Sequence, residues 1–169
     1  MAHTVIQGQL GGLAPSIPRA SHKFLELLSE VGGSSTARMI VAYLDGASRM
    51  NVGILFIDSG FDSMYIPPTA MSDDPRLAEL TGGVAVINIH SQMTIGGKAI
   101  PIGVSMMHEL GHAKQYIQEP VLFEIYYNSA MSITSGKNIP QIAIETDNLI
   151  THEAPILQEL GLPFRTKYD

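Results

Sequence analysis

Five residues, His108-Glu109-Leu110-Gly111-His112, stand inside a predicted helix and restrict the folds open to this chain. An apolar run over 103–118 lies between Pro101 and Pro120, and a run bounded in this way predicts a helix. Residues four positions apart lie on one face of a helix, so His108 and His112 can converge on one metal ion. The uncharged neighbours of the motif predict that this helix is buried.

Glu109 lies beside the two histidines and is placed to take a proton from a water molecule rather than to bind the metal. The chain has no cysteine, so a metal ion must be held by His, Asp or Glu side chains. Gln115 and Gln118 occupy positions where metzincins have Gly and His, which excludes that class. The remaining common third ligand is a carboxylate from a second helix.

A second predicted helix, over 142–154 and ending at Pro155, offers that carboxylate. Glu145 and Glu153 are the two candidates. On a regular α-helix they lie about 80° apart, so one would bind the metal and the other would orient a histidine N–H. We expect Glu145 as the third metal ligand, because it lies in the body of the helix, and keep Glu153 as the alternative. His152 is interpreted as a histidine outside the metal site.

Length and composition predict a globular chain. The 169 residues suit one domain, and 45% hydrophobic with 15% charged residues is not the composition of a disordered chain. The net charge of −6 argues against non-specific binding to nucleic acid or to anionic membranes. No apolar run is long enough to span a bilayer, and the N-terminus lacks the basic and apolar regions of a secretory signal peptide.

The other segments predict an α+β fold with an extended N-terminal arm over 1–20 and one domain over 21–169. An N-terminal helix is expected from Ser21 to Val31. Apolar segments predict a small twisted mixed sheet whose first two strands form a hairpin; the expected strands are 37–45, 51–58 and 84–90, the last continuing towards Ile95.

The connections are less regular. A long loop is expected over 59–82, with a short helix at 75–80, and another loop over 135–138. The segment 121–130 fits either a helix or a strand, because its periodicity does not separate the two.

The C-terminal part of the chain resembles a known family. The sequence HELGHA at 108–113, followed by THEAPILQELGLPFRTKY at 151–168, is similar to the NleD-like effector zinc metallopeptidases. That family includes bacterial type III effectors and toxin domains at the ends of Rhs-type secreted proteins. The matching positions, over roughly the last 65 residues, are Glu153, Ile156, Glu159-Leu160-Gly161-Leu162-Pro163 and Arg165. Ala154 and Leu157 depart from the family pattern, which has Asn and Arg there.

The resemblance implies a minimal zincin-like domain, in which the HExxH helix packs on a second, Glu-bearing helix. It implies a zinc-dependent endopeptidase with one Zn²⁺ per chain. It also favours a functional role for Glu153, because this residue lies in the matching segment. It further implies an effector or toxin that acts on a specific protein, with a secretion chaperone or an immunity protein as a partner. Such a protein is secreted or translocated without a classical signal peptide, and is cytoplasmic if it is not exported.

Peptide hydrolysis passes through an oxyanion that a cation or a phenol can stabilise. Arg165 and Tyr168 follow the second helix and are predicted to fold back over the site in this catalytic role. The strand at 84–90 is predicted to be an edge strand that binds a peptide as an additional strand, with Asn88 and His90 contacting the substrate. His90 is expected to be structural rather than a metal ligand.

Two other hypotheses stay open. The first is a catalytically inactive metal-binding or protein-interaction module with a zincin-like fold, against which the intact Glu109 argues. The second is a metal-dependent hydrolase that does not act on peptides. A small polar pocket in place of an open groove along the strand at 84–90 would favour it.

Overall fold

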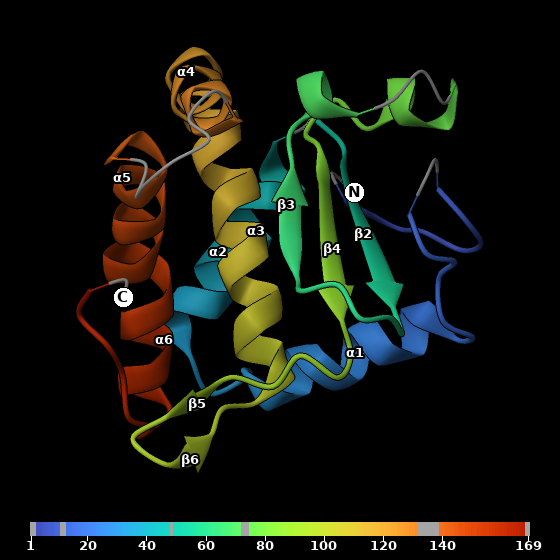
Figure 1. The fold of residues 1–169 in the computed structure, drawn as a ribbon. Coiled ribbons are helices and arrows are strands. Elements are labelled where there is room, and N and C mark those ends of the chain that lie inside the picture. Colours follow the sequence, from blue (N-terminus) through green and yellow to red (C-terminus); the bar gives the residue numbers. More distant parts are fainter. Residues whose placement is uncertain (1–2, 11–12, 48, 72–74, 132–138, 168–169) are drawn as a thin grey trace.

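Helices pack against one face of a mixed β-sheet in this α+β fold, shown in Figure 1. The computed structural model describes residues 3–10, 13–47, 49–71, 75–131 and 139–167. The sheet has the strand order β1-β2-β4-β3. Its parallel strands are β1 (His3–Val5), β2 (Val52–Ile57) and β4 (Val84–Asn88), and its antiparallel strand is β3 (Met64–Ile66). The predicted α+β class and the small mixed sheet are confirmed.

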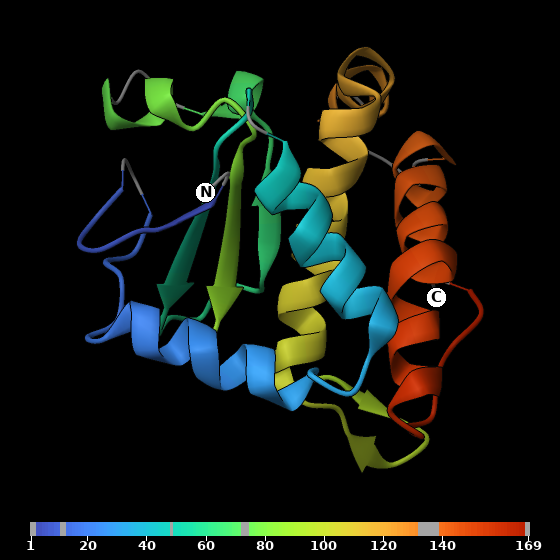
Figure 2. The same ribbon diagram turned by 180° about the vertical axis from the view of Figure 1, so that it is seen from behind.

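Both faces of the sheet are covered, so β2 and β4 are buried along their whole length. On one face, Ile54, Phe56 and Ile87 pack in the core with α1 (Ala20–Glu30), α2 (Ser35–Gly46) and α3 (Ile102–Gln118). In Figure 2, α1 crosses the lower ends of the strands, and α2 lies beside the strands and in front of α3. Strands buried on both faces carry continuous apolar runs, as the sequences of β2 and β4 do.

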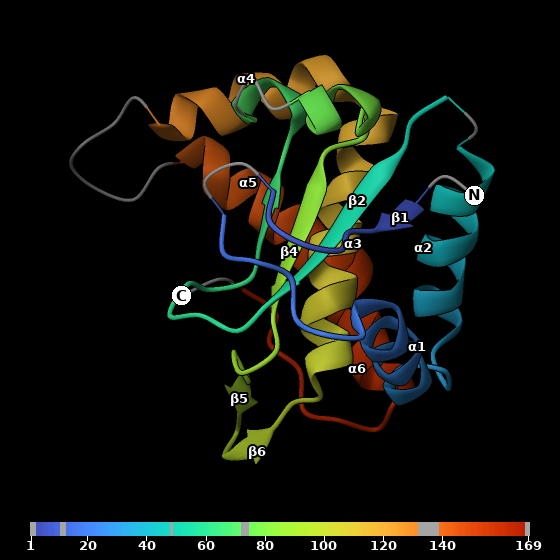
Figure 3. The ribbon, with the colours of Figure 1, turned by 90° about the vertical axis from the view of Figure 1, so that its right-hand side faces the viewer.

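The N-terminal arm covers the second face. Its first residues form β1, which pairs with β2, and Leu10 then packs against Leu55 and Ile57 in a second apolar cluster. Figure 3 looks onto this face, with the arm in front of the sheet and α3 behind it. The segment predicted as an extended arm is therefore part of the packed fold.

The segment 37–45 was predicted to be a strand, and this prediction is wrong. It belongs to α2, whose N-cap Ser34 accepts a hydrogen bond from the Ala37 N–H. The buried residues Ala37, Ile40 and Leu44 recur every three or four positions, so one helix face enters the core. The predicted hairpin with 51–58 does not exist, because β2 pairs in parallel with β1 and β4.

The predicted edge position of the strand at 84–90 is also wrong. Strand β4 lies between β2 and β3, and β3 is the edge strand next to α3. The Asn88 amide donates hydrogen bonds to the Ser59 and Phe61 carbonyls, so it holds the connection that leads to β3. The structure thus removes the reason for assigning Asn88 and His90 to substrate binding. His90 pairs with Asp58 at 3.2 Å, and both side chains are exposed.

The remaining connections contain short elements. The segment 59–82 holds β3 and two 3₁₀ turns, η1 (Pro68–Ala70) and η2 (Pro75–Glu79); the latter falls on the predicted short helix. The continuation of β4 towards Ile95 is a separate hairpin of β5 (Thr94–Ile95) and β6 (Lys98–Ala99). The predicted loop at 135–138 lies outside the described residues.

The helical half of the chain contains α3 and four further elements: α4 (Pro120–Met131), α5 (Ile139–Asn148), a π-helical turn η3 (Leu149–Glu153) and α6 (Ala154–Glu159). Helix α3 spans the predicted segment, and α4 shows that 121–130 is helical. Pro155 does not end the second helix as predicted, but stands in the first turn of α6. Among the described residues, no helix combines the length and apolar character needed to cross a membrane.

Candidate metal centre

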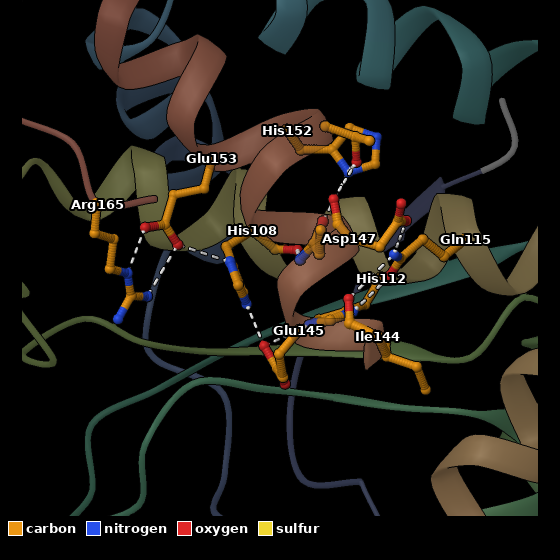
Figure 4. Close-up of polar contacts among 11 residues, drawn as sticks. His108, His112, Gln115, Ile144, Glu145, Asp147, His152, Glu153 and Arg165 are labelled. Atoms are coloured by element: carbon orange, nitrogen blue, oxygen red, sulfur yellow. Dashed lines mark hydrogen bonds and ion pairs between the residues drawn. The ribbon is translucent and has the colours of Figure 1, made fainter. Parts of the chain in front are cut away.

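The two histidines of α3 meet a carboxylate from α5 inside the fold. His108 and His112 are buried, and every residue from Gly103 to Ala113 is buried with them. Glu145 Oε2 lies 3.1 Å from His108 Nε2 and 3.3 Å from His112 Nε2. One atom from each of these three side chains falls within 4.8 Å of the others, so the group could hold a metal ion (Figure 4).

His108 is contacted on its other nitrogen by Glu153. The Glu153 Oε2 atom lies 2.8 Å from His108 Nδ1, and the Glu153 side chain is fully buried. Arg165 donates to both carboxylate oxygens, from Nε at 2.9 Å and from Nη2 at 3.2 Å. Burial raises the pKa of Glu153, but the bonds from His108 and Arg165 outweigh it and hold the pKa below its usual value. Glu153 is therefore a buried, charged support of His108.

The charges of this cluster are strongly coupled. Burial would lower the pKa of His108, but hydrogen bonds with Glu145 and Glu153 prevail and raise it to about 10. Burial would likewise raise the pKa of Glu145, and the hydrogen bonds from His108 and His112 bring it well below its usual range. His108 and each of the carboxylates Glu145 and Glu153 thus stabilise each other's charged form through direct contacts.

His112 has a different support, Gln115, one turn further along α3. His112 Nδ1 donates to Gln115 Oε1 at 2.8 Å. Gln115 Nε2 in turn donates to Asp147 Oδ2 at 2.6 Å and to the Ile144 carbonyl at 3.3 Å. In the sequence, Gln115 stands out only as a departure from the metzincin pattern. Its position three residues after a ligand candidate, on the same helix face, was a signal for this role.

The π turn η3 explains how Glu145 and Glu153 reach the same histidine. An α-helix turns by about 100° per residue, which places residues eight positions apart about 80° from each other. A π-helix is wider and turns by about 80° per residue, so the turn at 149–153 brings Glu153 back to about the side of Glu145. The Ala154 N–H bonds to the Leu149 carbonyl, as a π turn requires.

Pro155 accounts for the position of this turn. Proline lacks the N–H that an α-helix needs, and its ring clashes with the carbonyl four residues earlier. Widening the preceding turn relieves this clash and lets the helix continue into α6. The proline that predicted a helix end therefore marks a change of helix geometry.

Gly111 is required by close packing behind the histidines. A Cβ atom at Gly111 would lie 2.9 Å from His152 Nδ1 and still closer to Asn148 Oδ1. Asn148 donates to the His108 carbonyl at 2.8 Å, and its own oxygen lies 2.7 Å from His152 Nδ1. Burial and the nearby Lys114 lower the pKa of His152 to about 4, so it is neutral at pH 7. His152 lies outside the group of three possible ligands.

Glu109, like the two histidines, is buried. Burial raises its pKa, while the charges of His108 and His112 oppose this rise. A carboxylate with a raised pKa is a stronger base and is suited to accept a proton.

The structure places Arg165 differently from the prediction. In Figure 4, Arg165 and Glu145 lie on opposite sides of His108, so the guanidinium supports Glu153 rather than facing the ligand atoms. The geometry therefore assigns Arg165 a positioning role in place of oxyanion stabilisation. Tyr168, the other predicted catalytic residue, lies outside the described residues.

Comparison with known proteins provides no relative for this chain: no family model, no curated protein and no solved structure matches it. The site must therefore be interpreted from its own chemistry. Two imidazole nitrogens and one carboxylate oxygen form a donor set that suits a transition-metal ion, and a neighbouring buried carboxylate adds a proton acceptor.

Proposed function

We propose that this protein is a zinc-dependent metalloendopeptidase. The observation that carries the proposal is the convergence of His108, His112 and Glu145, with Glu109 buried beside them. A site that only bound a metal would have no use for a proton acceptor next to the ligands. The combination is the one needed for metal-assisted hydrolysis.

The donor set favours zinc as the metal. Two histidines with one glutamate are a common protein ligand set of catalytic zinc, and the three-residue group leaves a position for water or substrate. Zinc bound there would act as a Lewis acid and lower the pKa of water to about 7. His108, His112 and Glu145 would hold it, and Glu153 and Gln115 would keep the imidazole rings in place.

Glu109 performs the proton transfers in this proposal. Its carboxylate accepts a proton from the attacking water and passes it to the nitrogen of the leaving amine. Its burial supports this role, since a raised pKa makes the carboxylate a stronger base towards the attacking water.

Strand β3 is the element that we propose to bind the peptide backbone. It pairs with β4 on one side, packs against α3 and pairs with no further strand among the described residues. A peptide in extended conformation can add to such an edge through backbone hydrogen bonds. Peptide binding by β3 thus replaces the peptide binding predicted for the strand at 84–90.

The resemblance of 108–113 and 151–168 to effector metallopeptidases supports a more specific proposal, that the enzyme is a secreted or translocated effector or toxin with a specific protein substrate. A secretion chaperone or an immunity protein would then be its partner. The chemistry of the site does not depend on this assignment.

Metal content and cleavage together test the function. Wild type, His112→Ala and Glu109→Gln are purified, supplemented with zinc and analysed by elemental analysis and by mass spectrometry on a synthetic peptide library. We expect about one zinc per wild-type chain, zinc loss in His112→Ala, and zinc retention without cleavage in Glu109→Gln. Glu79→Gln, on the far side of the sheet, is the matched control. Absence of zinc from the wild type, or equal cleavage by Glu109→Gln, would refute the proposal.

A further inference from the structure

A cavity of about 260 Å³ opens between the end of α3, the first half of α4 and α5. Its walls are apolar and aromatic, formed by Leu122, Phe123, Tyr126 and Ile144. Two exposed acids, Glu119 and Asp147, also line it. The cavity therefore combines an apolar interior with negative charge where it meets solvent.

This cavity adjoins the candidate metal centre. Ile144 precedes the ligand candidate Glu145, and the Phe123 ring lies 6.2 Å from the His112 ring. Gln115, which accepts the hydrogen bond from His112, is itself part of the cavity lining. A peptide with its backbone at the metal could thus place a neighbouring side chain in the cavity.

The charge at the end of α3 favours a positive occupant. Helix α4 begins at Pro120, directly after α3, so the partial charges of the two helix ends offset each other, and the charge of the cavity comes from its acidic side chains. The last turn of α3 has no basic residue, and its C-cap is the acidic residue Glu119. Asp147 adds a second negative charge to the same lining. An apolar stem with a cationic end matches these walls and this charge, and lysine and arginine are the side chains with that build.

We propose that this cavity is a subsite that receives a lysine or arginine side chain of the substrate close to the cleaved bond. The proposal rests on the proposed peptidase function and gives it a substrate class. Glu119 is the residue that tests it, because Asp147 also holds Gln115 and its substitution would disturb His112.

The test measures binding and cleavage separately. Nα-acetyl-arginine methylamide is titrated into zinc-supplemented wild type, Glu119→Lys and Glu79→Lys, with NMR as the readout. The same three proteins are given a peptide library with randomised positions, and the cleaved bonds are identified by mass spectrometry. Glu79→Lys makes the same charge change on η2, which packs on the far face of the sheet.

We expect the probe to bind wild type and Glu79→Lys, and to bind Glu119→Lys about tenfold more weakly, since an attraction becomes a repulsion. Wild-type cleavage sites should be enriched in lysine and arginine at one position, and Glu119→Lys should lose this enrichment while it still cleaves. Glu119→Gln, which removes the charge without reversing it, should lie between the two.

Failure of the subsite and failure of the peptidase give different results. Cleavage without a preference for lysine or arginine, or a preference unchanged in Glu119→Lys, would refute the proposed subsite. Neither result would contradict the proposed peptidase function. Probe binding without any cleavage by zinc-loaded protein would overturn the peptidase, and the subsite with it. No probe binding and no basic preference would overturn the subsite on both measurements.

Discussion

The two histidines of the metal centre are supported in opposite ways. His108 is held by a buried carboxylate that comes from a distant part of the chain and is itself fixed by Arg165. His112 is held by a neutral amide on its own helix, which an exposed aspartate fixes. The first support comes from a carboxylate beyond α5, whereas the second lies on α3 itself and is only fixed in place by α5. The difference predicts that damage to the first support costs both metal affinity and stability, and damage to the second costs metal affinity alone.

The largest effect is expected for Glu153→Ala. It removes the carboxylate that contacts His108 Nδ1 and that pairs with Arg165, whose side chain is 30% exposed. We expect zinc affinity to fall about 100-fold and the free energy of unfolding to fall by about 3 kcal/mol. Competition with a chelator and urea denaturation measure the two quantities. An unchanged zinc affinity would show that His108 does not depend on Glu153.

Arg165→Met separates a positioning role from a catalytic one. If Arg165 acts through Glu153, zinc affinity falls about tenfold, and saturating zinc restores the rate of peptide cleavage. If Arg165 stabilises the oxyanion as first predicted, the rate stays low at saturating zinc. The measurement is the cleavage rate as a function of free zinc, with Arg38→Met, an exposed arginine on α2, as the control.

Substitutions at Gln115 test the second support. Gln115→Ala should lower zinc affinity about fivefold, with little change in stability because Gln115 and Asp147 are not buried. Gln115→Glu alone would place a second carboxylate beside that of Asp147, and the two would repel each other. We therefore combine it with Asp147→Asn, which provides an amide donor in place of the carboxylate. The double variant makes the two supports alike and should bind zinc at least as tightly as wild type. Weaker binding by the double variant than by Gln115→Ala would contradict this account.

The smallest effect concerns the attachment of α6 to α2. Glu159 accepts hydrogen bonds from Ser35 Oγ at 2.6 Å and from the Thr36 N–H at 3.0 Å, and these bonds, with those from Ser34 and Thr36 hydroxyls, lower its pKa to about 2. Glu159→Gln should lower the free energy of unfolding by about 1 kcal/mol at pH 7, a small effect because solvent screens this exposed charge.

The pH dependence of that cost follows from the lowered pKa. A carboxylate with a depressed pKa stabilises the fold above its usual pKa near 4.5, and this stabilisation is lost as the pH falls towards 2. Urea denaturation of wild type and Glu159→Gln should therefore differ at pH 7 and converge at low pH. A difference that is constant with pH would show that the charge of Glu159 is not involved.

Local patterns account for much of this fold. The buried α3 follows from its apolar run and from the i, i+4 spacing of its histidines. Both carboxylates considered as partners lie in the predicted segment 142–154, Glu145 on α5 and Glu153 in η3, and both approach His108. The strands β2 and β4 fall within the segments predicted as strands at 51–58 and 84–90, because apolar runs of that length between turn residues favour a strand.

Three features depended on tertiary structure. Helix α2 contains β-branched and apolar residues that fit a strand locally. Its packing against α3 and the hydrogen bond that the Thr36 N–H donates to Glu159 favour a helix instead. The edge of the sheet next to α3 is formed by β3 and not by β4, because strand order depends on pairing between segments that are distant in the sequence. The third feature is the π turn before Pro155. Locally, a proline predicts the end of a helix, and only the packing of α6 beyond Pro155 favours a wider turn through which the helix continues. The sequence alone determined which residues could bind a metal; the π turn decided that Glu145 and Glu153 reach the same histidine.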